Sequence, residues 1–511
     1  MARAKVERRA RGPSTAEEPR RHRSSFQIHD CFPMDNSTAL EASLKPAASN
    51  GRERFARLLG HVVFFSLLAL IALAAIPYGT VEPWWQALFE CAVFGLAALW
   101  MVEGFLAGSW HLNSYRLLWP LLALVALALA QTLFAGAAHQ LPLQIDGAWQ
   151  TLSADPHGTR RWMSKMLALI LVGAMLLRYT DNERRLRALV NVVIGVALAS
   201  AVFGLLRQMM QHQAGFVLPY LKPGFGYGQF INKNHFPFLM EMALGLVLGL
   251  ALAAGGARRE RLLVYAAAGL LLAGALVSAN SRGGVLSLLC QLLCAALLLP
   301  FARRARSDEL RAGSHALGRA RRAAGSMFGR AVLSLCLLAV IVVGIVWVGG
   351  DAFVGSLEAL PAEVGAPVEG VRWSVRRRDI WPATWQLIKE HPLAGVGFGG
   401  YWMAITEYHQ ASGEKTPQEA HNDYLEFLAS GGLIALAIGA WFVWLLINCA
   451  RKQLRSLDEG RRAACFGALV GLSGVAVHSS VDFGLHVTIN AVVLMALLVI
   501  ATADISTRRQ P

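Results

Sequence analysis

The chain has 511 residues, 55% of them hydrophobic and 16% charged, and apolar runs of about 20 residues, each long enough for a membrane-crossing helix, recur from Leu58 onward. With a mean hydropathy of +0.44, this composition excludes a soluble globular protein. The net charge of +15 does not indicate a nucleic-acid partner, because the basic residues are spread over many segments instead of gathering on one surface.

In chain order, the predicted elements form an all-α polytopic membrane protein. Residues 1–56 carry Arg, Ser and Pro without an apolar core, so we expect a disordered basic cytoplasmic tail. Residues 57–350 are expected to form transmembrane helices one to nine, and residues 430–511 to form helices ten to twelve with a short cytoplasmic tail. The predicted spans are 58–78, 84–107, 117–137, 162–178, 187–207, 234–256, 262–279, 284–301, 331–350, 430–449, 463–478 and 487–504.

The distribution of Lys and Arg predicts the orientation of these spans, because short cytoplasmic connections are enriched in both residues. If the N-terminus is inside, most of the 48 Lys and Arg fall in inner segments. Examples are the pairs Arg184 with Arg185 and Arg303 with Arg304. We therefore expect both termini to be cytoplasmic.

One connection on the predicted outer side, residues 351–429, is much longer than the others. Apolar periodicity around 380–390 and 424–429 predicts short helices at the membrane surface within it. Long loops of this kind usually carry function, so we place the chemistry there. The inner connection 302–330 is rich in Arg and Ala and is predicted to be a solvated helix or coil.

No metal or cofactor is expected. Of the 7 cysteines, Cys290 and Cys294 share a helix face in an apolar run without His or carboxylate partners, so packing is the better interpretation. No acidic triad in the sequence is suited to a divalent ion.

Arg376, Arg377 and Arg378 stand out in the long outer loop because they lie on the side where cations are depleted. Guanidinium groups suit phosphate, since their planar donor fork binds two oxygens at once. The alternative is that the cluster anchors lipid headgroups or pairs with acidic residues of the loop. Arg282, in the short turn SANSRGG at 278–284, is likewise a cation on the unexpected side, and its alternative is a snorkelling anchor.

His421 precedes Asn422, which is a predicted N-cap for a helix that starts at the next residue. The positive end of the helix dipole favours a neutral imidazole that can accept a proton. The alternative is a capping or surface residue without a catalytic role. His478 and Asp482, in the last outer turn, are expected on the same side and could orient other groups.

Asn232, Asn234 and His235 stand together where the predicted sixth span begins. They either cap that helix or line a polar cavity at its N-terminus. Composition alone favours capping.

Four segments together resemble the O-antigen ligase and O-antigen polymerase superfamily of bacterial envelope glycosyltransferases. They occur in the family's order and cover the chain from about residue 225 to residue 450. The segments are FINKNHF at 230–236, SANSRGG at 278–284, an Arg-x-x-x-Trp pattern at Arg377 and Trp381 followed by HPLAGVGFGGY at 391–401, and HNDYLEFLASGGL at 421–433.

The resemblance implies a GT-C-like enzyme of the bacterial inner membrane, with about twelve spans and a large periplasmic loop before the tenth. It implies a glycan donor carried by undecaprenyl diphosphate and lipid A-core or another glycan as acceptor, with membrane lipids as further partners. By position, His421 resembles the family's histidine that helps activate the acceptor hydroxyl. Arg282 and Arg377 resemble the arginines that hold the donor diphosphate.

Further substrate-binding candidates complete the predicted site. They come from the same four segments, and the basic loop pattern does not separate Arg377 from its two neighbours. These candidates are Arg376, Arg378, Asn232, Asn234, His235 and Asn422.

Three acceptors remain open within this superfamily. An O-antigen ligase transfers the glycan to lipid A-core, a polymerase of O-antigen or exopolysaccharide joins lipid-linked repeats, and a protein O-oligosaccharyltransferase modifies a protein. A transporter for lipid-linked sugars is the alternative from another class. A carrier would place polar groups along a path through the bilayer, whereas here they gather on one predicted outer face.

The orientation leads to a direct test with single cysteines at Ala411 and Ser314, in a background where the 7 native cysteines are replaced. Because positive charge is retained inside, an impermeant thiol reagent on intact spheroplasts should label position 411 and spare position 314. Lysed membranes, in which both positions become reactive, are the control. Labelling of 314 but not 411 in intact spheroplasts would reverse the predicted orientation.

Overall fold

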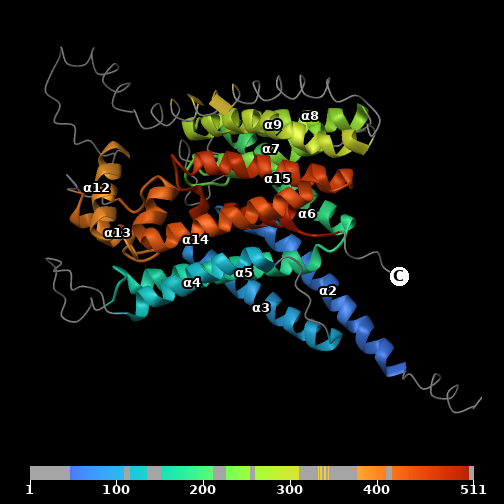
Figure 1. Ribbon diagram of the computed structural model, residues 1–511, viewed down its shortest axis with the longest axis horizontal. Helices are drawn as coiled ribbons and strands as arrows, with labels where there is room; N and C mark the ends of the chain where they lie inside the picture. Colours follow the sequence, from blue (N-terminus) through green and yellow to red (C-terminus); the bar gives the residue numbers. More distant parts are fainter. Residues whose placement is uncertain are drawn as a thin grey trace, which may run out of the picture. The chain divides into compact units, whose positions relative to one another are not determined.

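The computed structural model describes residues 47–108, 115–134, 151–210, 226–253, 259–309, 377–409 and 417–505, with scattered positions between 332 and 343. By backbone contacts the chain divides into two units, residues 1–51 and 52–511, and nearly all described residues belong to the second. The described part is all-helical, with thirteen α-helices and three short 3-10 helices (Figure 1). Its extended pairing is limited to an isolated bridge between Tyr227 and Phe230.

Eight of the described helices are long and apolar enough to cross a membrane. These eight are α2 (Ala47–Ala74), α3 (Pro83–Ala107), α4 (Leu118–Leu133) with η1 (Tyr115–Leu117), α5 (Pro156–Tyr179), α6 (Glu183–Met210), α8 (Arg259–Ser278), α9 (Arg282–Glu309, apolar as far as Pro300) and α14 (Asp423–Leu454). Two further apolar helices are shorter, namely α7 (Phe236–Leu252) and α16 (Thr488–Thr502). Helix α15 (Glu459–His478) has 20 residues.

These helices fall at the positions of the predicted spans, apart from the ninth. The predicted ninth span, 331–350, is described only at scattered positions, so the count of about twelve spans stays a prediction. Helix α2 begins at Ala47, inside the segment 1–56 that was expected to be a disordered tail. Exposed Arg52, Arg54 and Arg57 extend it, because Arg is a good helix former in water. The rest of that segment lies outside the described residues.

Helices α7 and α15 pack so closely that their backbones are in contact. Gly245 and Gly249 of α7 face Gly467 and Gly471 of α15, and a Cβ on any of the four would overlap the backbone of the opposite helix. Small residues four positions apart are the usual means of close helix packing in membranes, where apolar burial offers little driving force between helices. This contact brings the N-terminal end of α7 next to the C-terminal end of α15, and both carry polar residues there.

Helix α14 is broken at Gly432, whose φ of 62° and ψ of −160° are open only to glycine among ordinary residues. The break frees backbone groups, and residues 392–397 bind them. Leu433 and Ile434 donate their N–H groups to the carbonyls of Pro392 and Leu393, while Val396 and Gly397 donate theirs to the carbonyls of Ala429 and Ser430. The glycine-rich HPLAGVGFGGY segment is therefore the hydrogen-bonding partner of the α14 kink.

The buried amide of Gln131 completes this interlock from α4. Its Nε2 donates to the carbonyls of Ala394 at 2.6 Å and Ser430 at 2.8 Å, and its Oε1 accepts from the N–H of Phe398. One side chain thus connects α4, the glycine-rich segment and α14.

Within residues 351–429, the predicted outer loop, the expected helix near 380–390 is present as α12 (Arg377–Glu390), followed by α13 (Tyr401–Ala404) and η2 (Ile405–Glu407). In Figure 1, α12 and α13 lie together at one end of α14. The second predicted surface helix, 424–429, is not a separate element: it forms the first turns of α14, and the kink at Gly432 divides it from the rest. The loop segments 351–376 and 410–416 lie outside the described residues.

The kink yields a stability prediction for Gly432→Ala. A Cβ at this position would collide with the Leu393 carbonyl, and its backbone conformation costs a non-glycine residue about 1–3 kcal/mol. The variant in detergent should therefore have a lower melting temperature than the wild type. Fluorescence-detected size-exclusion chromatography after heating measures this temperature. Gly439→Ala is the matched control in the same helix, since a Cβ there meets only ordinary contacts with Phe427. Equal melting of the two variants would show that the kink is not needed.

Candidate active site

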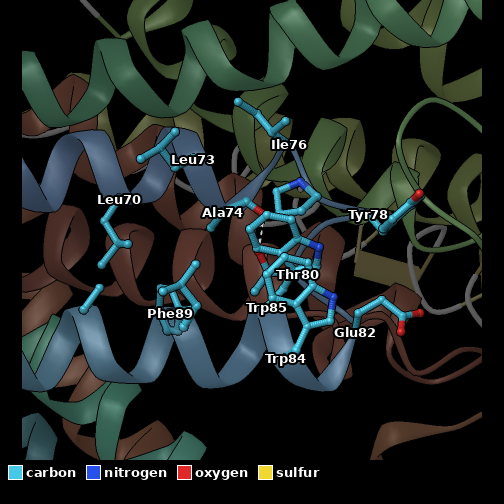
Figure 2. Close-up of a pocket in the computed structure, with 13 residues that line it drawn as sticks. Leu70, Leu73, Ala74, Ile76, Tyr78, Thr80, Glu82, Trp84, Trp85 and Phe89 are labelled. Atoms are coloured by element: carbon cyan, nitrogen blue, oxygen red, sulfur yellow. Dashed lines mark hydrogen bonds between the residues drawn. The ribbon is translucent and has the colours of Figure 1, made fainter. Parts of the chain in front are cut away.

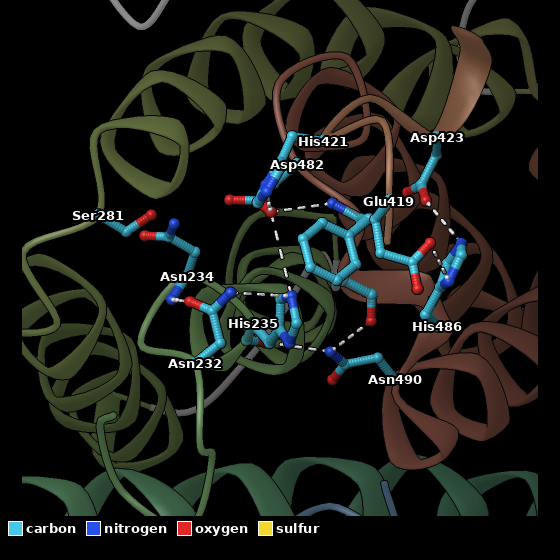
Figure 3. A network of polar contacts seen from close by, with 12 residues as sticks. Asn232, Asn234, His235, Ser281, Glu419, His421, Asp423, Asp482, His486 and Asn490 are labelled. Atoms are coloured by element: carbon cyan, nitrogen blue, oxygen red, sulfur yellow. Dashed lines mark hydrogen bonds and ion pairs between the residues drawn. The ribbon is translucent and has the colours of Figure 1, made fainter. Parts of the chain in front are cut away.

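Polar side chains from four segments far apart in the sequence converge at one end of the helices (Figure 3). The segments are the turn before α7, the turn before α9, the residues before α14, and the α15 to α16 connection with η3 (Gly484–His486). All four belong to connections that the sequence predicts on the outer side. The site therefore has walls from both halves of the chain.

His421 lies immediately before α14 and is held by its neighbours. Asn422 is the N-cap, as predicted, and its Oδ1 accepts from the N–H groups of Tyr424 and Leu425 at 3.0 and 3.1 Å. His421 itself adopts a left-handed backbone, with φ of 52°, so its ring departs from the helix direction. Its side chain is 32% exposed, which leaves the ring open to a substrate.

The carboxylate of Asp482 lies between two histidines. Its Oδ1 is 3.7 Å from Nδ1 of His421 and 4.0 Å from Nε2 of His235, and the side chain is 2% exposed. The Phe483 ring lies edge-on to both imidazoles, with centroid distances of 4.7 Å to His421 and 4.6 Å to His235. Asp482 thus places a buried carboxylate close to both imidazole rings.

The residues before α7 form a supported turn, and His235 occupies the N-cap position without capping the helix through its side chain. Asn232 accepts from the Asn234 N–H and approaches His235 Nε2 at 3.3 Å, while Asn490 donates to the His235 carbonyl. Burial lowers the pKa of His235 to about 4 against the raising effect of Asp482, so the ring is neutral at physiological pH. In Figure 3, Asn234 extends toward Ser281 at the start of α9.

Arg282 is the first residue of α9 and is half-buried. The two following glycines allow α9 to begin close to the other elements. A Cβ on Gly283 would lie 2.7 Å from Nε2 of His478, and one on Gly284 would lie 2.8 Å from Pro237. The start of α9 is therefore fixed against α7 and α15 at the site.

Arg377 and Arg378 are the first two residues of α12, but their side chains lie outside the described residues, as does the whole of Arg376. The beginning of this helix is nevertheless placed. Trp381, one turn later, donates its Nε1 proton to the carbonyl of Ala420 at 3.1 Å, and Ala420 directly precedes His421. The Arg-x-x-x-Trp pattern thus brings the start of α12 to the His421 backbone.

His478 and Glu241 form a fully buried pair beneath these groups, with His478 Nδ1 2.8 Å from Glu241 Oε1. Both side chains are 0% exposed, and the His478 ring stacks on Phe238 at 4.0 Å. The pair joins α15 to α7 and has no access to solvent. Its position makes it a support for the turn before α9 rather than a group that reaches a substrate.

Sequence reasoning missed a second cluster, in which His486 of η3 meets three carboxylates. Its ring nitrogens lie 3.3 Å from Glu419, 3.4 Å from Glu426 and 3.7 Å from Asp423. The acids themselves are visible in the segment EAHNDYLEF, around His421 and Asn422, but their partner His486 lies sixty or more residues away in the sequence.

The protonation of this cluster follows from its charges. Desolvation lowers the pKa of His486, but Glu419, Glu426 and Asp423 outweigh it and raise the pKa to about 10. For Glu419 the directions are reversed. Desolvation raises the pKa of its carboxyl group, but the interaction with His486 outweighs this effect and lowers the pKa to about 2. His486 and Glu419 are therefore an ion pair at neutral pH.

The same residues were tested as a metal site. Glu419, Glu426 and His486 offer ligand atoms that lie within 4.8 Å of one another. In the described structure these same atoms face one another, with His486 3.3 Å from Glu419 and 3.4 Å from Glu426, so an ion pair accounts for their proximity.

Two cavities accompany the site. One, of about 320 Å³, is lined by the His486 cluster together with Trp162, Phe398 and Trp402. The other, of about 710 Å³, lies between the ends of α2 and α3 (Figure 2) and is mostly apolar, with Glu82 its charged lining residue. Its composition suits a hydrocarbon chain rather than a chemical step.

Comparison with known families gives one match. Residues 267–440 match the family described as O-antigen ligase, so the chain carries an O-antigen ligase family domain in this range. A comparison with curated proteins found no match.

The His486 ion pair predicts how stability depends on pH. Glu419, with its pKa lowered from 4.5, stabilises above pH 4.5 and loses this effect as pH falls to about 2. His486, with its pKa raised from 6.5, stabilises below pH 6.5 and loses this effect as pH rises to about 10. The melting temperature of His486→Ala should therefore fall furthest below that of the wild type between pH 4.5 and pH 6.5. The difference between the two melting temperatures should narrow as the pH rises toward about 10.

His157→Ala, an exposed histidine at the start of α5, is the control and should show no such pH-dependent gap. A constant difference between His486→Ala and wild type from pH 5 to about 10 would contradict the assigned ion pair.

Proposed function

We propose that this chain, with its O-antigen ligase family domain at residues 267–440, is an O-antigen ligase-like glycosyltransferase that acts at the periplasmic face. It would move a glycan from undecaprenyl diphosphate to an acceptor hydroxyl on lipid A-core. The observation that carries the proposal is the meeting of His421, Asp482 and the N-terminal ends of α9 and α12 in one place.

His421 is the proposed general base. Asp482 lies beside Nδ1, which favours the tautomer with a proton on Nδ1 and leaves Nε2 free to accept the proton of the acceptor hydroxyl. As the acceptor oxygen bonds to the anomeric carbon, the bond to the lipid diphosphate breaks and its electrons leave with the diphosphate. The buried carboxylate of Asp482 then stabilises the imidazolium.

Arg282 and Arg377 are the proposed donors to the leaving diphosphate, with Arg376 and Arg378 as further contacts from the same loop. Fixed guanidinium groups stabilise charge that develops on a diphosphate, especially in a partly dry site, and no metal is needed in this scheme. The N-terminus of α9 adds the positive end of its dipole beside Arg282. Neutral His235, with Asn232, Asn234 and Asn422, offers hydrogen bonds to sugar or phosphate oxygens without adding charge.

The acceptor separates the remaining candidates. A polymerase of O-antigen or exopolysaccharide, or a protein O-oligosaccharyltransferase, would use the same donor chemistry on another hydroxyl. A deletion strain examined by lipopolysaccharide gel distinguishes them. Loss of all O-chain supports the ligase, a single retained repeat supports the polymerase, and an unchanged ladder indicates another glycan. A transporter would need polar groups across the bilayer, whereas this cluster lies at the helix ends.

The decisive variant is His421→Ala. A positioned general base typically contributes about 10²–10⁴-fold in rate, so transfer in membranes should fall by this factor at matched protein abundance. Insertion should be unaffected, because His421 lies before α14 and its side chain is partly exposed. Asp482→Asn should lower the rate less while preserving the fold, because it keeps the size of the side chain.

His409→Ala, in the same loop, is the matched control and should retain wild-type activity. Full activity of His421→Ala, or activity lost only in proportion to lost protein, would leave the capping role as the better account.

A further inference from the structure

The cavity of about 320 Å³ beside His421 is lined by two kinds of side chain. Aromatic rings form what we call its aromatic wall, and carboxylates with the His486 ring form its polar wall. Within the described residues, its lining contains no Lys or Arg. The lining residues used below are Trp162, Phe398, Trp402, Glu419, Asp423, Glu426 and His486.

The aromatic wall is held in place by specific contacts. Trp162 of α5 stacks on Phe398 with centroids 4.2 Å apart and planes 13° from parallel. Trp402 of α13 donates its Nε1 proton to Asp155 at 3.1 Å, yet its side chain remains 41% exposed. Flat, fixed and partly exposed rings of this kind can pack against the C–H face of a sugar ring.

The polar wall supplies hydrogen-bond acceptors. Glu419, Asp423 and Glu426 surround His486, which is held from behind by Lys165 donating to its backbone carbonyl at 2.6 Å. Sugar hydroxyls donate readily to carboxylates, since hydrogen bonds to charged acceptors are the stronger ones. The Glu419 carboxylate pairs with the His486 ring, so among the described lining residues the cavity offers no unpaired cation to an anionic sugar or a phosphate.

The cavity is contiguous with the proposed base. Glu419 and Asp423 stand two residues on either side of His421, and Figure 3 shows both acids turned toward His486. The Phe483 ring contacts His421 at 4.7 Å and His486 at 5.8 Å between centroids, so one aromatic side chain adjoins both groups.

We propose that this cavity binds a neutral, hydroxyl-rich sugar ring of the acceptor and presents one of its hydroxyls to His421. The assignment to the acceptor rests on the proposed function. The donor's diphosphate requires cations, which the family domain supplies at Arg282 and Arg377, whereas this cavity carries acidic groups. A sugar seated between Trp402 and Glu419 lies next to the group that removes the acceptor proton.

Saturation-transfer NMR on the full chain in lipid nanodiscs tests the site without requiring catalysis. The probes are methyl β-D-glucoside, methyl N-acetyl-β-D-glucosaminide and the anionic methyl β-D-glucuronide. Both neutral glycosides should give signals, and the glucuronide should not. Trp402→Ala should weaken binding of the neutral glycosides several-fold to about tenfold, through loss of one aromatic face, and Trp402→Phe should restore much of it.

Trp385→Ala is the matched control, because Trp385 of α12 is 49% exposed in the same loop but does not line the cavity. His421→Ala should retain sugar binding while losing transfer, so the two proposals fail separately. Sugar binding without any transfer by the wild type would remove the proposed function alone.

Three results would overturn the sugar subsite. The first is equal binding by Trp402→Ala and wild type, and the second is equal binding of the glucuronide. The third is titration with MgCl₂ or MnCl₂ that abolishes the sugar signals in the wild type but not in Glu419→Gln, which would make the cavity a cation site.

Discussion

The α14 kink is the constraint on which the site depends. A helix that crosses a membrane satisfies its backbone groups internally, so a break at Gly432 must be repaired by other groups. Residues 392–397 and the Gln131 amide make that repair through hydrogen bonds to both sides of the break. As a result the first turns of α14 are fixed against α4 and the outer loop, and His421 and Asn422 begin the helix in a defined place.

Around Phe483 the protein gives three histidines different electrostatic surroundings. His235 is buried and has its pKa lowered to about 4, so it remains neutral, whereas His486 faces three carboxylates and has its pKa raised to about 10. His421 differs from both in its geometry: its side chain is 32% exposed, and its Nδ1 lies 3.7 Å from the buried carboxylate of Asp482. A general base must come within reach of the hydroxyl proton that it removes, and this exposure gives an acceptor hydroxyl access to the ring.

Hydropathy predicted most helices closely, as for the span 84–107, which the structure has as Pro83–Ala107. The Asn422 N-cap was predicted because capping is a local interaction. The Gly432 kink was not, because two glycines in an apolar run are also compatible with a straight span. Gln131 gave no signal, since its partner Ala394 is 263 residues away. His486 was missed for the same reason: its charge is set by residues from another segment.

The family domain and the candidate site do not coincide. Arg282, Arg377 and His421 lie within residues 267–440, whereas Asp482 and His486 lie outside this range, as do the turn before α7 and Trp162. The groups proposed for donor binding and proton removal therefore belong to the matched region. The cavity proposed for the acceptor takes part of its walls from α5 and η3, which the match does not cover. The match thus covers Arg282, Arg377 and His421 fully but the proposed acceptor cavity only in part, and the acceptor is where the candidate functions differ.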